Sequence, residues 1–183
     1  MAMGVRGLGH DVVDVAAFAT QLAEPGTRMR SLFSVRELRQ VSERARVKND
    51  SEAVHLAVKW AGKEAFLKAW CEALGEKPYP FTLDDFPWRE VEILDDSRGV
   101  PHVMLSGRAM REFRDSLAGD GPSTGSPSMP RISDGGVADR YTDGNGAQHL
   151  RADSADCAGP IPGVHISLSH DGPIASAVVM IAV

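Results

Sequence analysis

Blocks of apolar residues separated by turn-forming ones predict a strand, several helices and a C-terminal hairpin. The first block, 5–15, is rich in valine and is interrupted by two glycines, and it predicts a strand that ends near Asp11. A helix over 15–22 is expected to follow this strand. Pro25-Gly26 would end that helix, because neither residue continues a regular helical ladder.

The middle of the chain predicts two helices. Ser34 and Glu37 have the spacing of a capping box, which predicts a helix over 35–45. A longer helix is expected between the N-cap candidates at 49–51 and a stop at Gly75. Its apolar stripe is Ala53, Leu56, Ala57, Trp60, Leu67, Cys71 and Leu74.

The second half of the chain predicts two hairpins and one short helix. Their ranges are 90–94 paired with 100–105, a helix from 106 or 107, and 164–169 paired with 174–183 across the turn 170–173. Met110, Phe113 and Leu117 are expected to face the core from the short helix. We therefore expect an α+β fold in which a small antiparallel or mixed sheet wraps around the long helix.

Residues 118–162 have a different composition from the rest of the chain. They are dominated by Gly, Ser, Pro, Asp and Thr, and such a segment buries too little apolar area to offset its ordering entropy. We expect a flexible insertion within a single domain that covers 1–183.

Composition narrows the functional classes. The 183 residues carry a net charge of −5, so the basic excess typical of nucleic-acid binding is absent. The two cysteines, Cys71 and Cys157, form no metal-binding or disulfide spacing, which favours free thiols in a reducing cytoplasm. No secretory signal and no stretch of ~20 apolar residues is found, so a cytoplasmic protein that does not cross a membrane is expected.

Glu64 and Asp11 are the first candidates for chemistry. Glu64 falls at the edge of the apolar stripe, where a carboxylate is costly unless it is paired, neutral or bound to a metal. An ion pair with Lys68, four residues on, would explain it without any function. Asp11 is placed by the pattern at a strand end, and a helix N-cap would explain it equally well.

A third candidate cluster is Ser167, Ser169 and His170 at the C-terminal turn. Their hydroxyl and imidazole groups could bind phosphate oxygens, or they could be polar residues on the open face of a hairpin. A serine hydrolase is disfavoured, because no GxSxG nucleophile elbow occurs.

Three motifs taken together resemble one known family. GLGHDVVDV near the N-terminus, WAGKEAFLKAW on the long helix and HISLSHDGPIASAVV near the C-terminus occur in the order found in the holo-[acyl-carrier-protein] synthases, the short AcpS-type phosphopantetheinyl transferases. A further G-x-P element, at 99–101, also matches. The resemblance covers about residues 3–117 and 163–183, and the segment between them has no counterpart in the compact family pattern.

The resemblance implies a site and a reaction. Asp11 and Glu64 would bind Mg²⁺, a hard cation that suits two carboxylates, waters and phosphate oxygens. A serine of an acyl carrier protein would attack the β-phosphate of coenzyme A and release adenosine 3′,5′-bisphosphate, with Glu64 or a metal-bound water as base. His10 is a poor Mg²⁺ ligand and is not included. The groups expected on the CoA phosphates are Lys59, Lys63, Lys68, Ser169 and His170.

The resemblance also implies partners. The acidic carrier protein would dock on a basic surface, for which Arg28, Arg30, Arg36 and Arg39 are the candidates. Short members of the family form trimers with active sites between subunits, so a homotrimer is expected. Three other functions stay open at this point: a CoA- or nucleotide-binding module without transfer, a Mg²⁺-dependent diphosphate hydrolase, and a non-catalytic interaction protein.

Overall fold

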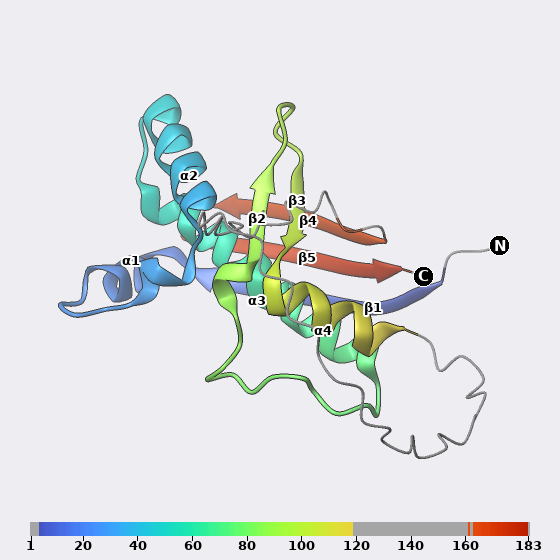
Figure 1. Ribbon diagram of the computed structural model, residues 1–183. Helices are drawn as coiled ribbons and strands as arrows, with labels where there is room; N and C mark the ends of the chain where they lie inside the picture. The colour runs from blue at the N-terminus through green and yellow to red at the C-terminus, as the bar shows by residue number, and fades with distance from the viewer. Residues whose placement is uncertain (1–3, 119–160, 162, 183) are drawn as a thin grey trace, which may run out of the picture. The chain divides into compact units, whose positions relative to one another are not determined.

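The long helix α3 (Glu52–Leu74) is the element on which most of the others pack. The computed structural model describes residues 4–118, 161 and 163–182 (Figure 1). The side chain of Ser51 accepts a hydrogen bond from the Ala53 amide at its N-terminus, and Gly75 follows its last residue, as expected from the sequence. The predicted insertion at 118–162 lies, apart from residues 118 and 161, outside the described residues.

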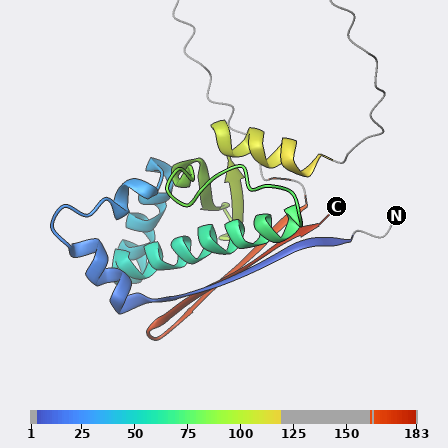
Figure 2. The ribbon, with the colours of Figure 1, turned by 90° about the horizontal axis from the view of Figure 1, so that it is seen from below.

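A three-stranded antiparallel sheet lies along α3 (Figure 2). Its strands, in the order β1-β5-β4, are β1 (Val5–Asp14), β5 (Ile174–Ala182) and β4 (Val164–Asp171). Two glycines let β1 approach the helix closely, because a Cβ at Gly7 would lie 2.1 Å from the Ala69 carbonyl oxygen and one at Gly9 would lie 1.9 Å from that of Ala65.

Two predicted boundaries of this sheet were wrong. The first strand does not end near Asp11 but continues to Asp14, whose carboxylate caps the following helix by accepting a hydrogen bond from Ala17. Asp11 is therefore an inward-facing residue within a strand. The C-terminal turn is shorter than predicted, since β4 runs to Asp171 and only Gly172 and Pro173 connect it to β5.

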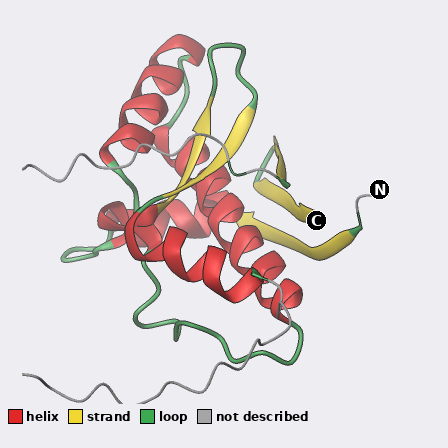
Figure 3. Cartoon of the chain, turned by 45° about the vertical axis from the view of Figure 1, so that its right-hand side comes forward, coloured by secondary structure: helices red, strands yellow, loops and turns green. Residues whose placement is uncertain are grey.

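A second, two-stranded sheet also packs on α3 (Figure 3). It pairs β2 (Val91–Asp95) with β3 (Pro101–Leu105) and is preceded by the short 3₁₀ helix η2 (Trp88–Glu90). Helix α4 (Gly107–Leu117) follows, and it buries Phe113 with Met110 and Leu117 partly covered, as predicted. Because helices and antiparallel sheets are segregated, the predicted α+β class is confirmed.

The N-terminal helices complete the fold. They are α1 (Val15–Ala23), the 3₁₀ turn η1 (Met29–Leu32) and α2 (Val35–Lys48). The predicted capping box of α2 is present, with the Ser34 hydroxyl accepting from the Glu37 amide and the Glu37 carboxylate accepting from the Ser34 amide.

The predicted apolar stripe of α3 was wrong in one respect. Sheets on two sides bury this helix on almost every face, and its small residues allow the close contacts. The half-buried positions include Trp60, Glu64, Leu67 and Cys71, four residues that the stripe assigned to the core side or its edge. Glu64 thus lies on the least covered face of the helix, where a ligand can reach it.

Candidate functional site

Asp11 is buried and only half satisfied. Its side chain, 6% exposed, points from β1 toward α3. Its Oδ1 accepts a hydrogen bond from Lys68 Nζ at 2.7 Å, and the same ammonium donates to the His10 carbonyl oxygen at 3.2 Å. Its Oδ2 is buried without a hydrogen-bond partner. A buried carboxylate oxygen left without a partner is costly, so this atom calls for a cation or a donor.

Glu64 lies beside Asp11 and feels its charge. Burial, and after it the charge of the neighbouring Asp11 carboxylate, raises the pKa of Glu64 to about 7, and Lys68 opposes the shift. The sequence left open an ion pair between Glu64 and Lys68 along the helix. In the structure Lys68 instead pairs with Asp11 of β1. The structure therefore brings together Asp11, Glu64 and Lys68, as the resemblance implied.

This cluster suits a hard divalent cation. An additional positive charge beside Asp11 and Glu64 would relieve their mutual repulsion and give the unpartnered Oδ2 of Asp11 a ligand. Within residues 4–118 and 161–182, where described, no three His, Cys, Asp or Glu side chains gather as a metal site. Two protein carboxylates leave room for water and phosphate oxygens, which is how Mg²⁺ is commonly bound.

His10 lies on the other face of the sheet. Successive side chains of a strand point to opposite sides, so His10 and Asp11 diverge. Its Nε2 lies 3.0 Å from the Ser176 hydroxyl. The His10 ring therefore lies away from the Asp11 carboxylate.

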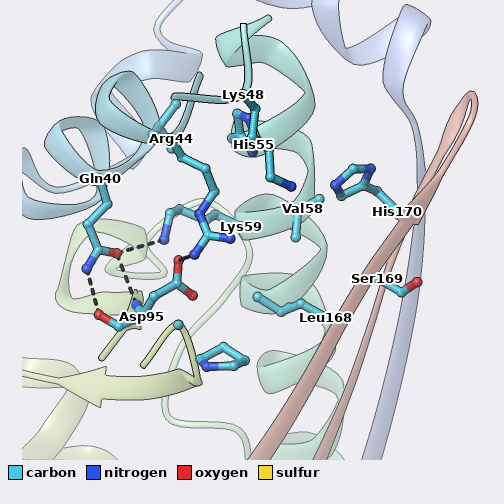
Figure 4. A pocket seen from close by; sticks show the side chains of 13 residues that line it. Gln40, Arg44, Lys48, His55, Val58, Lys59, Asp95, Leu168, Ser169 and His170 are labelled. Atoms are coloured by element: carbon cyan, nitrogen blue, oxygen red, sulfur yellow. Dashed lines mark hydrogen bonds and ion pairs between the residues drawn. The ribbon is translucent and has the colours of Figure 1, made fainter. Parts of the chain in front are cut away.

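A cationic pocket lies at the N-terminal half of α3 (Figure 4). Its volume is about 350 Å³, and α2, α3, β4 and the β2–β3 hairpin line it. The charged and titratable side chains that define this cationic pocket are Arg44, Lys48, His55, Lys59, Asp95 and His170. Positive groups dominate the lining, so a polyanion would be favoured there.

Hydrogen bonds position two of these cations. Lys59 Nζ donates to the Ile93 carbonyl at 2.6 Å and to Gln40 Oε1 at 3.2 Å, and burial lowers its pKa. Arg44 pairs with Asp95 at 3.0 Å. Arg44, Lys48 and His55 were not predicted from the sequence. The signal that could have found the first two is their i,i+4 spacing on one face of a predicted helix.

The predicted serine–histidine cluster divides between two environments. The His170 ring stands edge-on to the His55 ring, with centroids 6.3 Å apart, at the margin of the cationic pocket. Ser169 also borders the pocket, but Figure 4 shows its hydroxyl directed away from Arg44 and Lys59. Ser167 is exposed on the outer face of the sheet.

Lys63 is not brought to either cluster. Its side chain is 0% exposed, and its ammonium lies 3.0 Å from Glu37 Oε2 and donates to the carbonyl oxygens of Trp88 and Val91. Burial lowers the pKa of Lys63. The Glu37 carboxylate also accepts from the Ile93 amide at 3.0 Å. The ion pair joins α2, α3 and β2 in the core, so Lys63 does not lie on a ligand-binding surface.

The four arginines proposed for carrier docking are exposed on η1 and α2 or just before η1. Two are already paired with acidic side chains of this chain: Arg30 with Glu52 at 2.6 Å, and Arg36 with Glu92. Their contribution to a positive surface is reduced by these neighbours.

Comparison with known proteins identifies the family. Residues 7–120 match the family model described as the 4′-phosphopantetheinyl transferase superfamily. The holo-[acyl-carrier-protein] synthase of Bifidobacterium adolescentis is 50% identical over 184 residues, 97% of this chain and 99% of its own. That of Bifidobacterium animalis subsp. lactis is 45% identical, with 96% of each chain covered.

A solved structure supports the same assignment. The ACPS–CoA complex of Chronobacterium ammoniagenes is 27% identical, covers 98% of this chain and 96% of its own, and has a TM-score of 0.65. The resemblance read from the three sequence motifs is confirmed. The chain belongs to the 4′-phosphopantetheinyl transferase superfamily, among its AcpS-type members.

Proposed function

We propose that this protein transfers the 4′-phosphopantetheine arm of coenzyme A to a serine of an apo acyl carrier protein. The serine oxygen forms a bond to the β-phosphorus, the bond to the adenosine 3′,5′-bisphosphate leaving group breaks, and the serine proton passes to a base. The observation that carries the proposal is the half-satisfied Asp11 beside Glu64, in a chain of this family.

The residues have separate roles in this proposal. Asp11 and Glu64 would hold Mg²⁺, which supplies charge neutralisation of the diphosphate and stabilisation of the leaving oxygen. Lys68, oriented by Asp11, donates to a phosphate oxygen. Glu64, or a water that it orients, accepts the serine proton.

The two clusters of one protomer face opposite sides of α3. Lys59 and Lys68 are nine residues apart, which is about 180° around a helix. Lys59 contacts α2 and β2, whereas Lys68 contacts β1. One CoA molecule that uses both clusters is therefore best held by the carboxylate pair of one protomer and the cationic pocket of its neighbour.

Self-association has a suitable surface. The face of the three-stranded sheet that does not contact α3 carries Leu8, Val12 and Val178, which are 54%, 52% and 40% exposed. Burial of such a face against other copies would remove apolar area from water. A closed homotrimer would bury it in every protomer, and this assembly is part of the proposal.

The carrier protein is the proposed macromolecular partner. An acidic surface on it would be attracted by Arg28, Arg30, Arg36 and Arg39, chiefly raising the association rate at low salt. Among the described residues no helix is long and apolar enough to cross a bilayer. The cytoplasm, where CoA and carriers meet, stays the predicted location.

A mass-shift assay tests the proposal. The full chain is incubated with CoA and an apo carrier protein, with Mg²⁺ or with a chelator. We expect the carrier to gain the mass of one phosphopantetheine arm only when Mg²⁺ is present. No gain on several carriers would contradict transfer, and release of adenosine 3′,5′-bisphosphate without a carrier would instead indicate a diphosphate hydrolase.

A further inference from the structure

The outer edge of β2 is covered by side chains. In the described part of the chain β2 pairs with β3 along one edge only, so alternate residues of β2 direct their amide and carbonyl groups away from β3. At Ile93, the amide donates to Glu37 Oε1 at 3.0 Å and the carbonyl oxygen accepts from Lys59 Nζ at 2.6 Å. At Asp95, Gln40 of α2 binds both backbone groups. This edge therefore fixes side chains that also line the cationic pocket.

Gln40 binds three groups at once, as the dashed lines in Figure 4 show. Its Nε2 donates to the Asp95 carbonyl oxygen at 2.8 Å, and its Oε1 accepts from the Asp95 amide at 3.0 Å. The same Oε1 accepts from Lys59 Nζ at 3.2 Å. A carboxamide offers a donor and an acceptor without a charge, whereas a glutamate would place a negative charge among the pocket cations. Glutamine thus makes these contacts and leaves the positive potential of the pocket intact.

The contacts of Gln40 orient two cations of the pocket. An ammonium group has three hydrogens to donate. Lys59 uses one on the Ile93 carbonyl oxygen and one on Gln40, which leaves the third for a ligand in the pocket. The Asp95 carboxylate pairs with Arg44 at 3.0 Å, and Gln40 holds the backbone of Asp95 on both sides of this carboxylate. Gln40 therefore acts on Lys59 directly and on Arg44 through Asp95.

We propose that Gln40 is a positioning residue of the cationic pocket, which orients Lys59 and Arg44 toward the phosphate groups of CoA without contacting CoA itself. This inference rests on the proposed function. Cations that are held in place before the ligand arrives lose less side-chain entropy on binding, so their attraction for phosphate is realised more fully. Gln40 contributes to CoA affinity and not to the chemical step, because the Lys68–Asp11 cluster lies on the opposite side of α3.

The first test separates binding from chemistry. Gln40→Met keeps an unbranched side chain of similar length but removes its donor and acceptor. We expect the KM for CoA to rise about tenfold while kcat changes less than twofold, because only the orientation of the pocket cations is lost. Gln21→Met, the same change at an exposed position of α1, is the matched control. A fall in kcat with an unchanged KM for CoA would overturn the inference.

Calorimetric titration with CoA keeps this inference separate from the proposed function. It measures the Kd of the full chain for CoA without a carrier and without turnover, and thermal melts show that each variant is folded. The Kd of Gln40→Met should exceed that of the wild type about tenfold, even if no carrier is ever modified. An unchanged Kd in folded Gln40→Met would overturn the positioning role while leaving transfer intact. Failure of the wild type to bind CoA would overturn both.

A second test shows through which residues Gln40 acts. In a Lys59→Met background, Gln40→Met should raise the Kd for CoA by about threefold or less, because only Arg44 is then left to be misplaced. An Arg44→Ala background should show the same reduction, and it removes a cation that is partly exposed, so the fold is less at risk. A full tenfold effect in each background that folds would show that Gln40 contacts CoA itself and would overturn the positioning role.

Discussion

The two pockets along α3 have nearly the same volume and opposite chemistry. The cationic pocket, about 350 Å³, gathers Arg44, Lys48 and Lys59 around the N-terminal half of the helix. A second, apolar pocket of about 360 Å³ lies between the C-terminal half of α3 and the segment 79–86, and Trp70, Leu74 and Phe81 are among its lining residues. Volume therefore says little about the ligand here, and the difference in lining charge separates a polyanion site from a neutral one.

Glu64, the helical member of the carboxylate pair, lies on α3 between these two regions. Glu64 follows Lys59 by five residues and precedes Leu67 by three, so a single helix spaces the three kinds of chemistry along its length. The following changes test in turn the carboxylate pair, the buried ion pair of α3 and the cationic pocket.

The largest expected effect is loss of the carboxylate pair. Asp11→Ala or Glu64→Ala should lower transfer by about a thousandfold or more, because the metal site accounts for several kcal/mol of barrier reduction. Mass spectrometry of the carrier measures this, and circular dichroism checks the fold. Asp115→Ala, which removes an exposed carboxylate of α4, is the matched control. Wild-type turnover in Asp11→Ala would refute the metal assignment.

The next largest expected effect is a loss of stability when the buried Lys63–Glu37 ion pair is broken. Lys63→Met leaves the Glu37 carboxylate in the core without its cation, which is expected to cost about 3–5 kcal/mol. Urea unfolding measures the change. The double variant Lys63→Met with Glu37→Gln should recover part of it, because no uncompensated charge is then buried. A Lys63→Met protein as stable as wild type would contradict the burial of this pair.

CoA binding at the cationic pocket should respond to the charge of its lining. Arg44→Ala is expected to raise the KM for CoA about tenfold, since a charged hydrogen bond contributes about 1.5–3 kcal/mol. High salt should raise the same KM, because it screens the attraction between the pocket and the CoA phosphates. Arg98→Ala, on an exposed turn, is the control. Steady-state kinetics at two ionic strengths measure both quantities, and a salt-independent KM would argue against the cationic pocket.

The smallest expected effect is a pH dependence of stability without metal. The pKa of Glu64 is near 4.5 when unfolded and about 7 when folded, so the folded state holds a proton that the unfolded state releases. The free energy of unfolding should therefore fall as pH rises from about 4.5 to about 7, by about 1 kcal/mol after allowance for solvent screening.

Thermal melts with a chelator measure this pH dependence. Glu64→Gln should remove it, because the amide does not titrate. Added Mg²⁺ should reverse the fall near pH 7 by stabilising the ionised pair. Stability that rises over the same pH range in the chelated protein would contradict the raised pKa.

Local chemistry made much of the fold predictable. The capping residue Ser51, the stop at Gly75 and the capping box at Ser34 act over three or four residues, so the sequence located the helices well. The strand end near Asp11 was predicted wrongly, because it does not depend on neighbours along the chain. Pairing with β5 decides where the strand ends, and this pairing continues to Asp14.

For the site, too, part could be predicted from the sequence and part only from the tertiary structure. The three motifs, in order, were enough to identify the family and to nominate Asp11, Glu64 and Lys68, which the structure brings together. They did not distinguish Lys63, buried among backbone carbonyls, from Lys68, which reaches the carboxylate pair. Positions five residues apart on one helix differ by about 140° in direction, and what each direction meets depends on other elements.

The amino-acid sequence by itself determined the helices, the two hairpins and the residue types available for phosphate chemistry, because these depend on neighbours along the chain. Only the tertiary structure decided which face of α3 is open, which cations line one pocket and which aromatic residues line the other. The cationic pocket is built from segments tens of residues apart, and the apolar pocket is built from α3 and the loop that follows it, so their contacts exist only after strands and loops have packed on one helix.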